Sequence, residues 1–233
     1  MTRLSFGLVC VCVCLFVTSQ IQAGAVELLP FRDIDPAVAS SSYNSGSRPA
    51  TNACGDMNHP SSAQWMSAGL RWVDRDDHDK GAVGDNSPSI AFYFDDLYIL
   101  DHMVVRNFTE SDGGRGIKLV NILVSATGNG DDWVAVFADP LEFQKGVYQD
   151  HNNGGAWTEY DPQIIGLGGV GAKAVKFEIL SNQYNNNFQN PENDVNGTIT
   201  GVAGVQFFGT AVPEPATMSL LALGGLALLR RRK

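Results

Sequence analysis

The chain has 233 residues, of which 44% are hydrophobic and 18% charged, and its formal net charge is −9. Five of its 16 basic residues and one of its 25 acidic residues lie in two terminal segments, so the central part carries 11 basic and 24 acidic residues, a net charge near −13. Such a field repels phosphate backbones, which excludes nucleic acid as a partner. About 185 central residues suffice for one domain rather than two.

Residues 1–25 have the pattern of a secretory signal peptide. Arg3 supplies a positive charge, Phe6–Val17 an apolar core, and Ala23-Gly24-Ala25 a small-residue cleavage site. An uncleaved anchor helix is the alternative. Three of the four cysteines lie in the apolar core, so Cys54 alone stays in the mature chain and no internal disulfide can form. We expect Cys54 to be an ordinary buried cysteine; the alternative is a reactive or intermolecular thiol.

Between residues 26 and 88 the sequence indicates few regular elements. Residues 26–47 contain two prolines and a serine-rich run, which predicts an irregular lead-in with at most one short strand. Residues 48–88 are polar and rich in Gly, Asp and Asn, which predicts a long loop held in place by buried Trp65 and Trp72.

From residue 89 onward the pattern is that of short β-strands. In Ser89–Ile99 apolar side chains alternate with others, as in a half-buried strand. The same reasoning predicts strands at Asp101–Phe108, Ile117–Ala126, Trp133–Phe137, Leu141–Phe143, Ala174–Leu180 and Ala203–Gly209. Seven or eight short strands without a convincing amphipathic helix predict an all-β, antiparallel sandwich.

Catalytic motifs are not evident in the sequence. Gly166, Gly168 and Gly171 satisfy G-x-G-x-x-G, but a strand pattern follows them instead of a helix, so they predict a turn. The sequence has no H-E-x-x-H, no G-x-S-x-G and no paired-cysteine zinc spacing, and its four histidines are scattered. We therefore expect no enzymatic activity.

Several blocks of the central part, taken in order, resemble discoidin-like, coagulation-factor type C domains. They are Pro49–Asp56, Trp65-Met66-Ser67, Ile90–Asp95, Arg115–Lys118, Ala172–Phe177 and Gly204–Gly209. The resemblance spans Ala50 to Gly209. It implies a galactose-binding-like jelly-roll β-sandwich, whose members mostly bind glycans or surface ligands through loops at one end, and it places Trp65 and Trp133 in the core.

The resemblance also implies a possible site for a structural calcium ion. Many sugar-binding members of that group hold calcium with loop oxygens and with a Glu of the last strand. Asn52 and Asp56 are the matching loop residues here, but Gly204 stands where the Glu is expected. Calcium prefers six to eight oxygen ligands, so one missing carboxylate weakens the site. The acidic segment Arg71–Asn86 is either a solvated loop or an opportunistic cation site.

For a glycan site, an exposed aromatic ring is needed for stacking and planar polar groups are needed beside it. The predicted ligand-binding residues on loops are Trp157, His151, Asn152, Asn153, His59 and Arg115. Asn107 is a further polar candidate. The alternative is that Trp157 only fixes the conformation of its own loop.

The last segment, residues 211–233, has three parts in a fixed order. Pro213-Glu214-Pro215 is followed by the apolar run Ala216–Leu229 and by the basic end Arg230-Arg231-Arg232-Lys233. The apolar run is shorter than the roughly 20 residues of a relaxed membrane-spanning helix. This order resembles the PEP-CTERM sorting signal of Gram-negative, biofilm-forming bacteria. The resemblance implies transient inner-membrane association and cleavage by an exosortase.

Together these features predict an exported protein of the cell surface or extracellular matrix. Its parts are a signal peptide (1–25), a discoidin-like domain (26–210) and a sorting segment (211–233). We expect the domain to bind an extracellular polysaccharide or another glycan without catalysis. A structural matrix or adhesion protein without a sugar site is one alternative, and a hydrolase accessory or enzyme is another.

Overall fold

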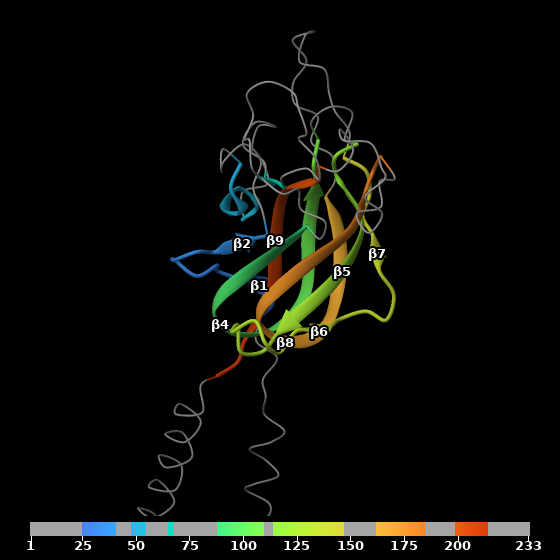
Figure 1. Ribbon diagram of the computed structural model, residues 1–233. Helices are drawn as coiled ribbons and strands as arrows, with labels where there is room; N and C mark the ends of the chain where they lie inside the picture. Colours follow the sequence, from blue (N-terminus) through green and yellow to red (C-terminus); the bar gives the residue numbers. More distant parts are fainter. Residues whose placement is uncertain are drawn as a thin grey trace, which may run out of the picture.

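The computed structural model describes residues 25–40, 48–54, 65–67, 88–109, 114–146, 162–184 and 199–213. Within these ranges every regular element is a β-strand except one 3-10 helix, η2 (Ala50–Ala53), and all strand pairs are antiparallel (Figure 1). The prediction of an all-β antiparallel sandwich is therefore confirmed. No helix in the described ranges is long and apolar enough to cross a membrane. The predicted signal peptide lies outside them.

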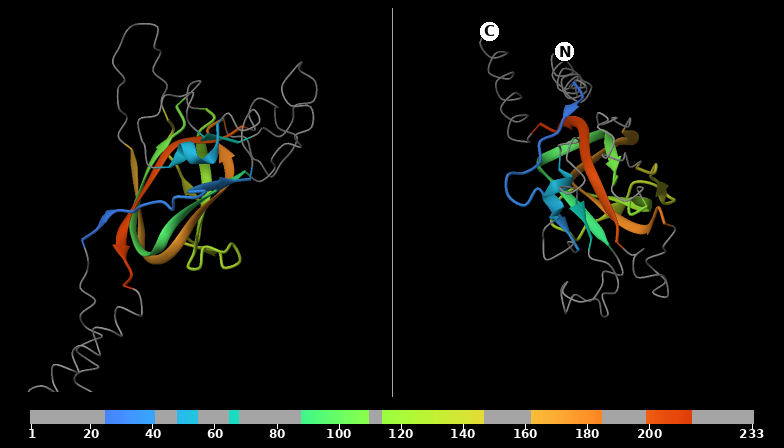
Figure 2. Two further views of the ribbon diagram at one scale, coloured as in Figure 1. Left: turned by 90° about the vertical axis from the view of Figure 1, so that its left-hand side faces the viewer. Right: turned by 90° about the horizontal axis from the view of Figure 1, so that it is seen from above.

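Two long strands, β4 (Ser89–Asn107) and β8 (Gln163–Asn182), build both sheets of the sandwich. Residues 89–93 of β4 pair with 174–178 of β8, and residues 98–105 of β4 pair with 163–172 of β8. Both strands bend between these halves, so the ribbon that they form folds over on itself (Figure 2). The core lies inside this fold.

The shorter strands extend the two halves of the ribbon. In the first sheet, β9 (Gly201–Ala211) pairs with β4, and β1 (Glu27–Leu28) and β3 (Trp65–Met66) pair with β9. In the second sheet, β2 (Ala37–Ala39) pairs with β4, and β5 (Ile117–Ser125) pairs with β8. Two strands, β6 (Val134–Ala135) and β7 (Leu141–Glu142), pair with β5.

The structure corrects three strand predictions. Ser89–Ile99 and Asp101–Phe108 are one strand, because Leu100 stays buried and the irregularity at Asp101 is absorbed as a register shift. The predicted turn at 166–171 lies inside β8, where Gly168 and Gly169 have positive φ angles (70° and 75°) at an irregularity in the pairing with β4. The lead-in contains two short strands, β1 and β2, rather than at most one.

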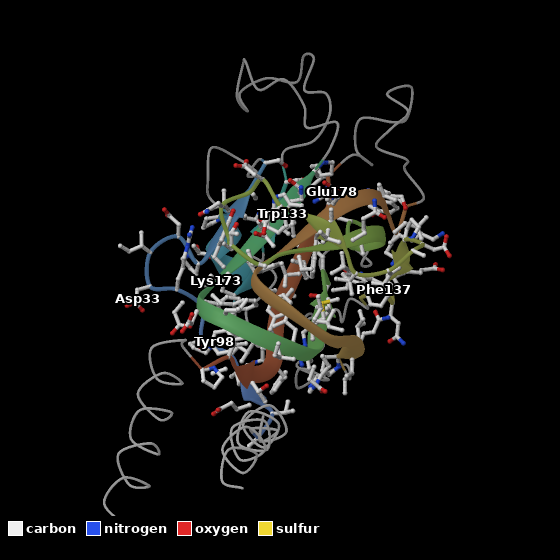
Figure 3. All side chains as sticks on the ribbon, turned by 90° about the horizontal axis from the view of Figure 1, so that it is seen from below. Asp33, Tyr98, Trp133, Phe137, Lys173 and Glu178 are labelled. Carbon is white, nitrogen blue, oxygen red and sulfur yellow. The ribbon has the colours of Figure 1, made fainter. Side chains whose placement is uncertain are left out.

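Aromatic side chains fill the core between the sheets. The ring centroid of Phe92 lies 5.3 Å from that of Phe177 and 5.5 Å from that of Phe207, and all three rings are fully buried. Trp65 is also fully buried, as predicted. The prediction for Trp133 is wrong: this half-exposed residue lies on the outer face of the second sheet, where the Lys176 ammonium is 5.0 Å from its ring centroid (Figure 3).

The sandwich has two ends with different roles. At the loop end, at the top of Figure 1, the end of β4, the start of β5, the end of β8 and the start of β9 lie together. At the opposite end, the terminus end, β4 and β8 bend and β9 reaches its last residue. There the Val212 amide donates a hydrogen bond to the Leu97 carbonyl (3.0 Å), so the chain is held in place up to Val212.

A carboxylate fixes the turn between β5 and β6. Asp132 accepts hydrogen bonds from the hydroxyl of buried Ser125 and from the amide and hydroxyl of Thr127 (3.0 and 2.9 Å). The Ser125 hydroxyl in turn accepts the Gly128 amide (2.8 Å). These donors favour the ionised carboxylate and hold the pKa of Asp132 below its usual value, with the Ser125 hydrogen bond as the main cause.

We predict that this turn makes the domain sensitive to acid. Because the folded-state pKa of Asp132 is depressed, its contribution is present above the ordinary Asp pKa of about 4 and is lost as the pH falls through the folded-state value. Asp132→Asn should lower the free energy of unfolding at pH 7, and the difference from the unsubstituted protein should shrink at about pH 2. Urea unfolding at both pH values measures this; a difference independent of pH would contradict the assignment.

Candidate functional site

The loop end is built around one buried side chain, Asn107, at the end of β4. Its Oδ1 accepts the amides of Phe108 and Ile117 (both 2.9 Å), and its Nδ2 donates to the carbonyls of Ile117 (2.6 Å) and Gln144 (2.8 Å). A Cβ atom at Gly116 would lie 2.8 Å from Asn107 Oδ1, so only glycine leaves room for this arrangement. Asn107 thereby joins the end of β4, the start of β5 and the segment after β7.

Two further amide side chains extend the same network. The side chain of Gln183 donates to the carbonyls of Ile117 (2.9 Å) and Phe143 (2.7 Å), and its backbone amide donates to Gly116 (2.9 Å). The buried Asn182 side chain donates to the Ile199 carbonyl (3.1 Å) and accepts the Tyr184 amide (3.1 Å). The ends of β4, β5 and β8 and the approach to β9 are therefore one hydrogen-bonded unit.

A buried pair on the neighbouring chain segments completes the base of the loop end. The Ser67 amide donates to the Thr200 carbonyl (2.8 Å), and the Thr200 amide donates to the Ser67 hydroxyl (3.1 Å). Both residues are fully buried. Because Ser67 directly follows β3, this pair attaches β3 to the start of β9. The loop end is thus a rigid platform from which the adjoining segments emerge.

The surface of this platform carries an aromatic residue beside an arginine. Tyr184 is 42% exposed, and its ring packs over Gly114, where any Cβ atom would overlap it. Its amide also donates to the Gly114 carbonyl (2.9 Å). Arg115 follows directly; its carbonyl accepts the Gly201 amide (3.0 Å), and its Nε is buried without a hydrogen-bond partner among the described residues. Tyr184 thus presents an exposed ring at the loop end, and Arg115 follows the glycine over which this ring packs.

The structure describes only part of the predicted ligand-binding set. Arg115 lies at the loop end, as the sequence predicts. Trp157, His151, Asn152, Asn153 and His59 lie outside the described residues, so their placement stays a prediction. Asn107 uses its side chain internally and is structural rather than a ligand-binding group.

Tyr184 was missed by the sequence reasoning. It lies in the polar, asparagine-rich run at 182–198 that predicts only a loop, where no apolar periodicity draws attention to an aromatic residue. The available signal was its position: an aromatic residue two positions after β8 ends stays close to the supporting strand.

The described residues do not complete a calcium site. Asn52 lies in η2, and Asp56 is outside the described residues. Gly204, at the position expected to supply a carboxylate, is buried in β9. In the described part of the chain no three His, Cys, Asp or Glu side chains are grouped as metal ligands. Two oxygen-bearing residues fall short of the six to eight oxygens that calcium takes, so we derive no role for a metal.

Cys54 closes the base of the loop end beside β9. It is half-buried against the core, and its backbone forms an isolated bridge with Val205. Burial raises the pKa of its thiol to about 12. A thiol that stays protonated at neutral pH is a poor nucleophile, which agrees with the ordinary structural cysteine of the two alternatives.

Comparisons with known proteins match the last residues of the chain to a sorting motif and the domain to solved structures of similar fold. Residues 211–233 match the PEP-CTERM protein-sorting motif. Of the six residues predicted for sorting, Pro213 is described and exposed, whereas Glu214, Pro215, Arg230, Arg231 and Arg232 lie outside the described residues. A search of curated proteins found no match to the chain.

Solved structures with a similar fold are carbohydrate-binding or type C domains. The CBM32-1 and CBM32-2 domains of Clostridium perfringens ZmpB in complex with GalNAc match with 16% identity and a TM-score of 0.50 over 78% of this chain and 34% of that one. An F5/8 type C domain from Bacteroides fragilis matches with 15% identity and a TM-score of 0.50 over 81% of this chain and 99% of that one. This chain therefore spans about a third of the ZmpB chain and almost all of the Bacteroides domain. The fold is that of the discoidin-like, galactose-binding-like domains, as the sequence predicts.

We predict that Asn107→Ala destabilises the domain by about 3 kcal/mol, because it leaves the amides of Phe108 and Ile117 and the carbonyl of Gln144 without their side-chain partner. Gln163→Ala is the matched control: its exposed amide bonds Gln144 and Glu142 (2.9 and 3.3 Å), and its loss should cost less than about 1 kcal/mol. Urea unfolding of both variants measures the difference. Equal costs would show that Asn107 is not the centre of the network.

Proposed function

We propose that this protein is exported and that its domain binds a carbohydrate, without catalysis, through the loop end. The observation that carries the proposal is the exposed Tyr184 ring beside Arg115, held on a platform whose amide side chains are already hydrogen-bonded. An aromatic face stacks on the apolar face of a sugar ring, and a guanidinium donates to its hydroxyl or carboxylate oxygens. Packing of the Tyr184 ring over Gly114 preorganises this group, which reduces the entropy lost on binding.

The fold and the sorting motif support this proposal. The similar C. perfringens domains were solved in complex with GalNAc, so a discoidin-like sandwich in that protein binds an amino sugar. A sorting motif directly after the domain indicates an extracellular destination, where polysaccharides are available as ligands. The acidic net charge agrees with uncharged glycans better than with polyanions.

The position of the motif also fits a binding role. The described chain enters the motif at the terminus end, opposite the loop end (Figure 1). A chain held by its sorting segment at the inner membrane would therefore direct the loop end away from that membrane. We propose that a sorting protease of the exosortase type acts on this segment and that the protein then resides at the cell surface or in the extracellular matrix.

A structural matrix or adhesion role without a sugar site is the second candidate. The exposed aliphatic side chains of the first sheet favour it, among them Leu28 (51% exposed) and Ile164 (69%). Such side chains contact proteins more readily than sugars. The two functions differ in which surface, loop end or sheet, is required for activity.

We predict that glycan-array binding by the full chain is lost, at least about 10-fold in affinity, in Tyr184→Ala and in Trp157→Ala, as expected for a lost stacking contact of about 1.4 kcal/mol or more. Arg115→Ala should weaken binding as well. The control is Ile34→Ala, which removes a more exposed side chain (77%) from the segment between β1 and β2. Melting curves must show that each variant is folded. Binding to no glycan by the unsubstituted protein would refute the proposal while leaving the fold intact.

We predict that the secreted protein lacks Arg230 to Lys233, because the proposed processing removes the apolar run and the basic end together. Mass spectrometry of the protein recovered from the culture medium measures its C-terminal mass. The cell-associated precursor serves as the control and should retain these residues. An intact C-terminus on the secreted form would contradict processing.

A further inference from the structure

One edge of the first sheet is open in the described structure. Residues 163–170 of β8 pair with β4 on one side, and no described residue pairs with their other side. In an antiparallel strand the backbone amides and carbonyls point alternately to the two sides. The outer edge of β8 therefore presents a row of donors and acceptors.

The sequence of this edge lacks the features that usually prevent pairing with another chain. Residues 163–170 read Gln-Ile-Ile-Gly-Leu-Gly-Gly-Val, with no charged residue and no proline. Natural edge strands are commonly protected by charges, prolines or bulges. Here the side chain of Gln163 occupies the first position, and the positive φ angles of Gly168 and Gly169 end the regular part. Residues 164–167 remain as an unprotected segment.

The side chains on this segment form a projection and a gap on the same face. Ile164 and Gly166 point outward, opposite Val104 and His102 of β4, whereas Ile165 and Leu167 face the core. Ile164 is 69% exposed, and a Cβ atom built on Gly166 would meet no atom within 4 Å. The large apolar side chain of Ile164 thus lies two residues from Gly166, which leaves open space on the same face of the sheet.

We infer that two copies of this chain pair through residues 163–167 of β8, antiparallel and related by a two-fold axis at Ile165. In this register Ile164 of each copy lies opposite Gly166 of the other. Each isoleucine side chain therefore occupies the space beside the glycine of the other copy. A two-fold interface requires such self-complementarity. The backbone edges satisfy each other, and the first sheet becomes continuous across the two copies.

The pairing has a consequence for binding, which rests on the proposed function. A two-fold axis perpendicular to the sheet reverses the strand direction in the second copy. The two loop ends therefore face in opposite directions, and one dimer can hold two separate glycan chains. Two sites on one particle join polysaccharide chains into a network, whereas a monomer with one site only coats them.

The test compares the full chain with Ile164→Lys and with Val134→Lys by sedimentation equilibrium. Ile164→Lys places a charge at the centre of the edge and should raise the dimer dissociation constant at least about 10-fold. Val134 is similarly exposed (64%) but lies on β6, which pairs with β5 in the second sheet, so its substitution should leave the constant unchanged. Hydrogen exchange of residues 164–167 in the unsubstituted chain should slow as protein concentration rises.

Three results would overturn the inference: a monomer at all concentrations, self-association that Ile164→Lys leaves unchanged, or exchange at 164–167 independent of concentration. Association through the apolar run 216–229 would give the second of these. Glycan binding is measured separately on the same proteins. Ile164→Lys should retain the glycan affinity of the unsubstituted chain but lose its ability to precipitate polysaccharide. Dimerisation without any glycan binding would refute the proposed function and leave the dimer standing.

Discussion

The loop end depends on the buried side chain of Asn107. An amide has two donors and two acceptor lone pairs, and here each is matched to a backbone group of a different chain segment or of the adjacent residue. A buried polar group without partners costs about 1–3 kcal/mol, so this residue fixes the geometry of its neighbours strongly. The requirement for Gly116 follows from it. The hydrogen bonds of Asn107 and its neighbours fix the backbone that carries Tyr184 and Arg115.

The two long strands explain why the sandwich has one loop end and one terminus end. Because β4 and β8 each contribute to both sheets, the bends at 94–97 of β4 and at 173 of β8 close the terminus end with continuous chain. Tyr98 helps to hold the bend: its hydroxyl donates to Asp95 (2.7 Å), and burial together with this carboxylate raises the pKa of the phenol.

Alternation of apolar residues was sufficient to predict the sandwich, because a strand with one buried face must show a period of two. It did not predict that β4 continues through Asp101, since a register shift leaves no mark of its own in the sequence. Burial of Asn107 depends on Ile117 and Gln144, which are distant in sequence, and local reasoning assigned it to the ligand. Arg115 lies at the loop end, and its role in ligand binding stays a prediction, whereas Tyr184 gave no periodic signal.

The pairing of the chain's first and last strands also constrains when the domain can form. Leu28 in β1 pairs with Phe208 in β9, 180 positions later, and β9 lies between β1 and β4 in the first sheet. Contacts between such distant residues form late, because closing a long loop costs entropy before any contact offsets it. A chain crossing a membrane from its N-terminus delivers β9 last. In the export that we propose, the first sheet would thus be completed only when the sorting segment reaches the membrane, and folding would coincide in time with arrival at the sorting site.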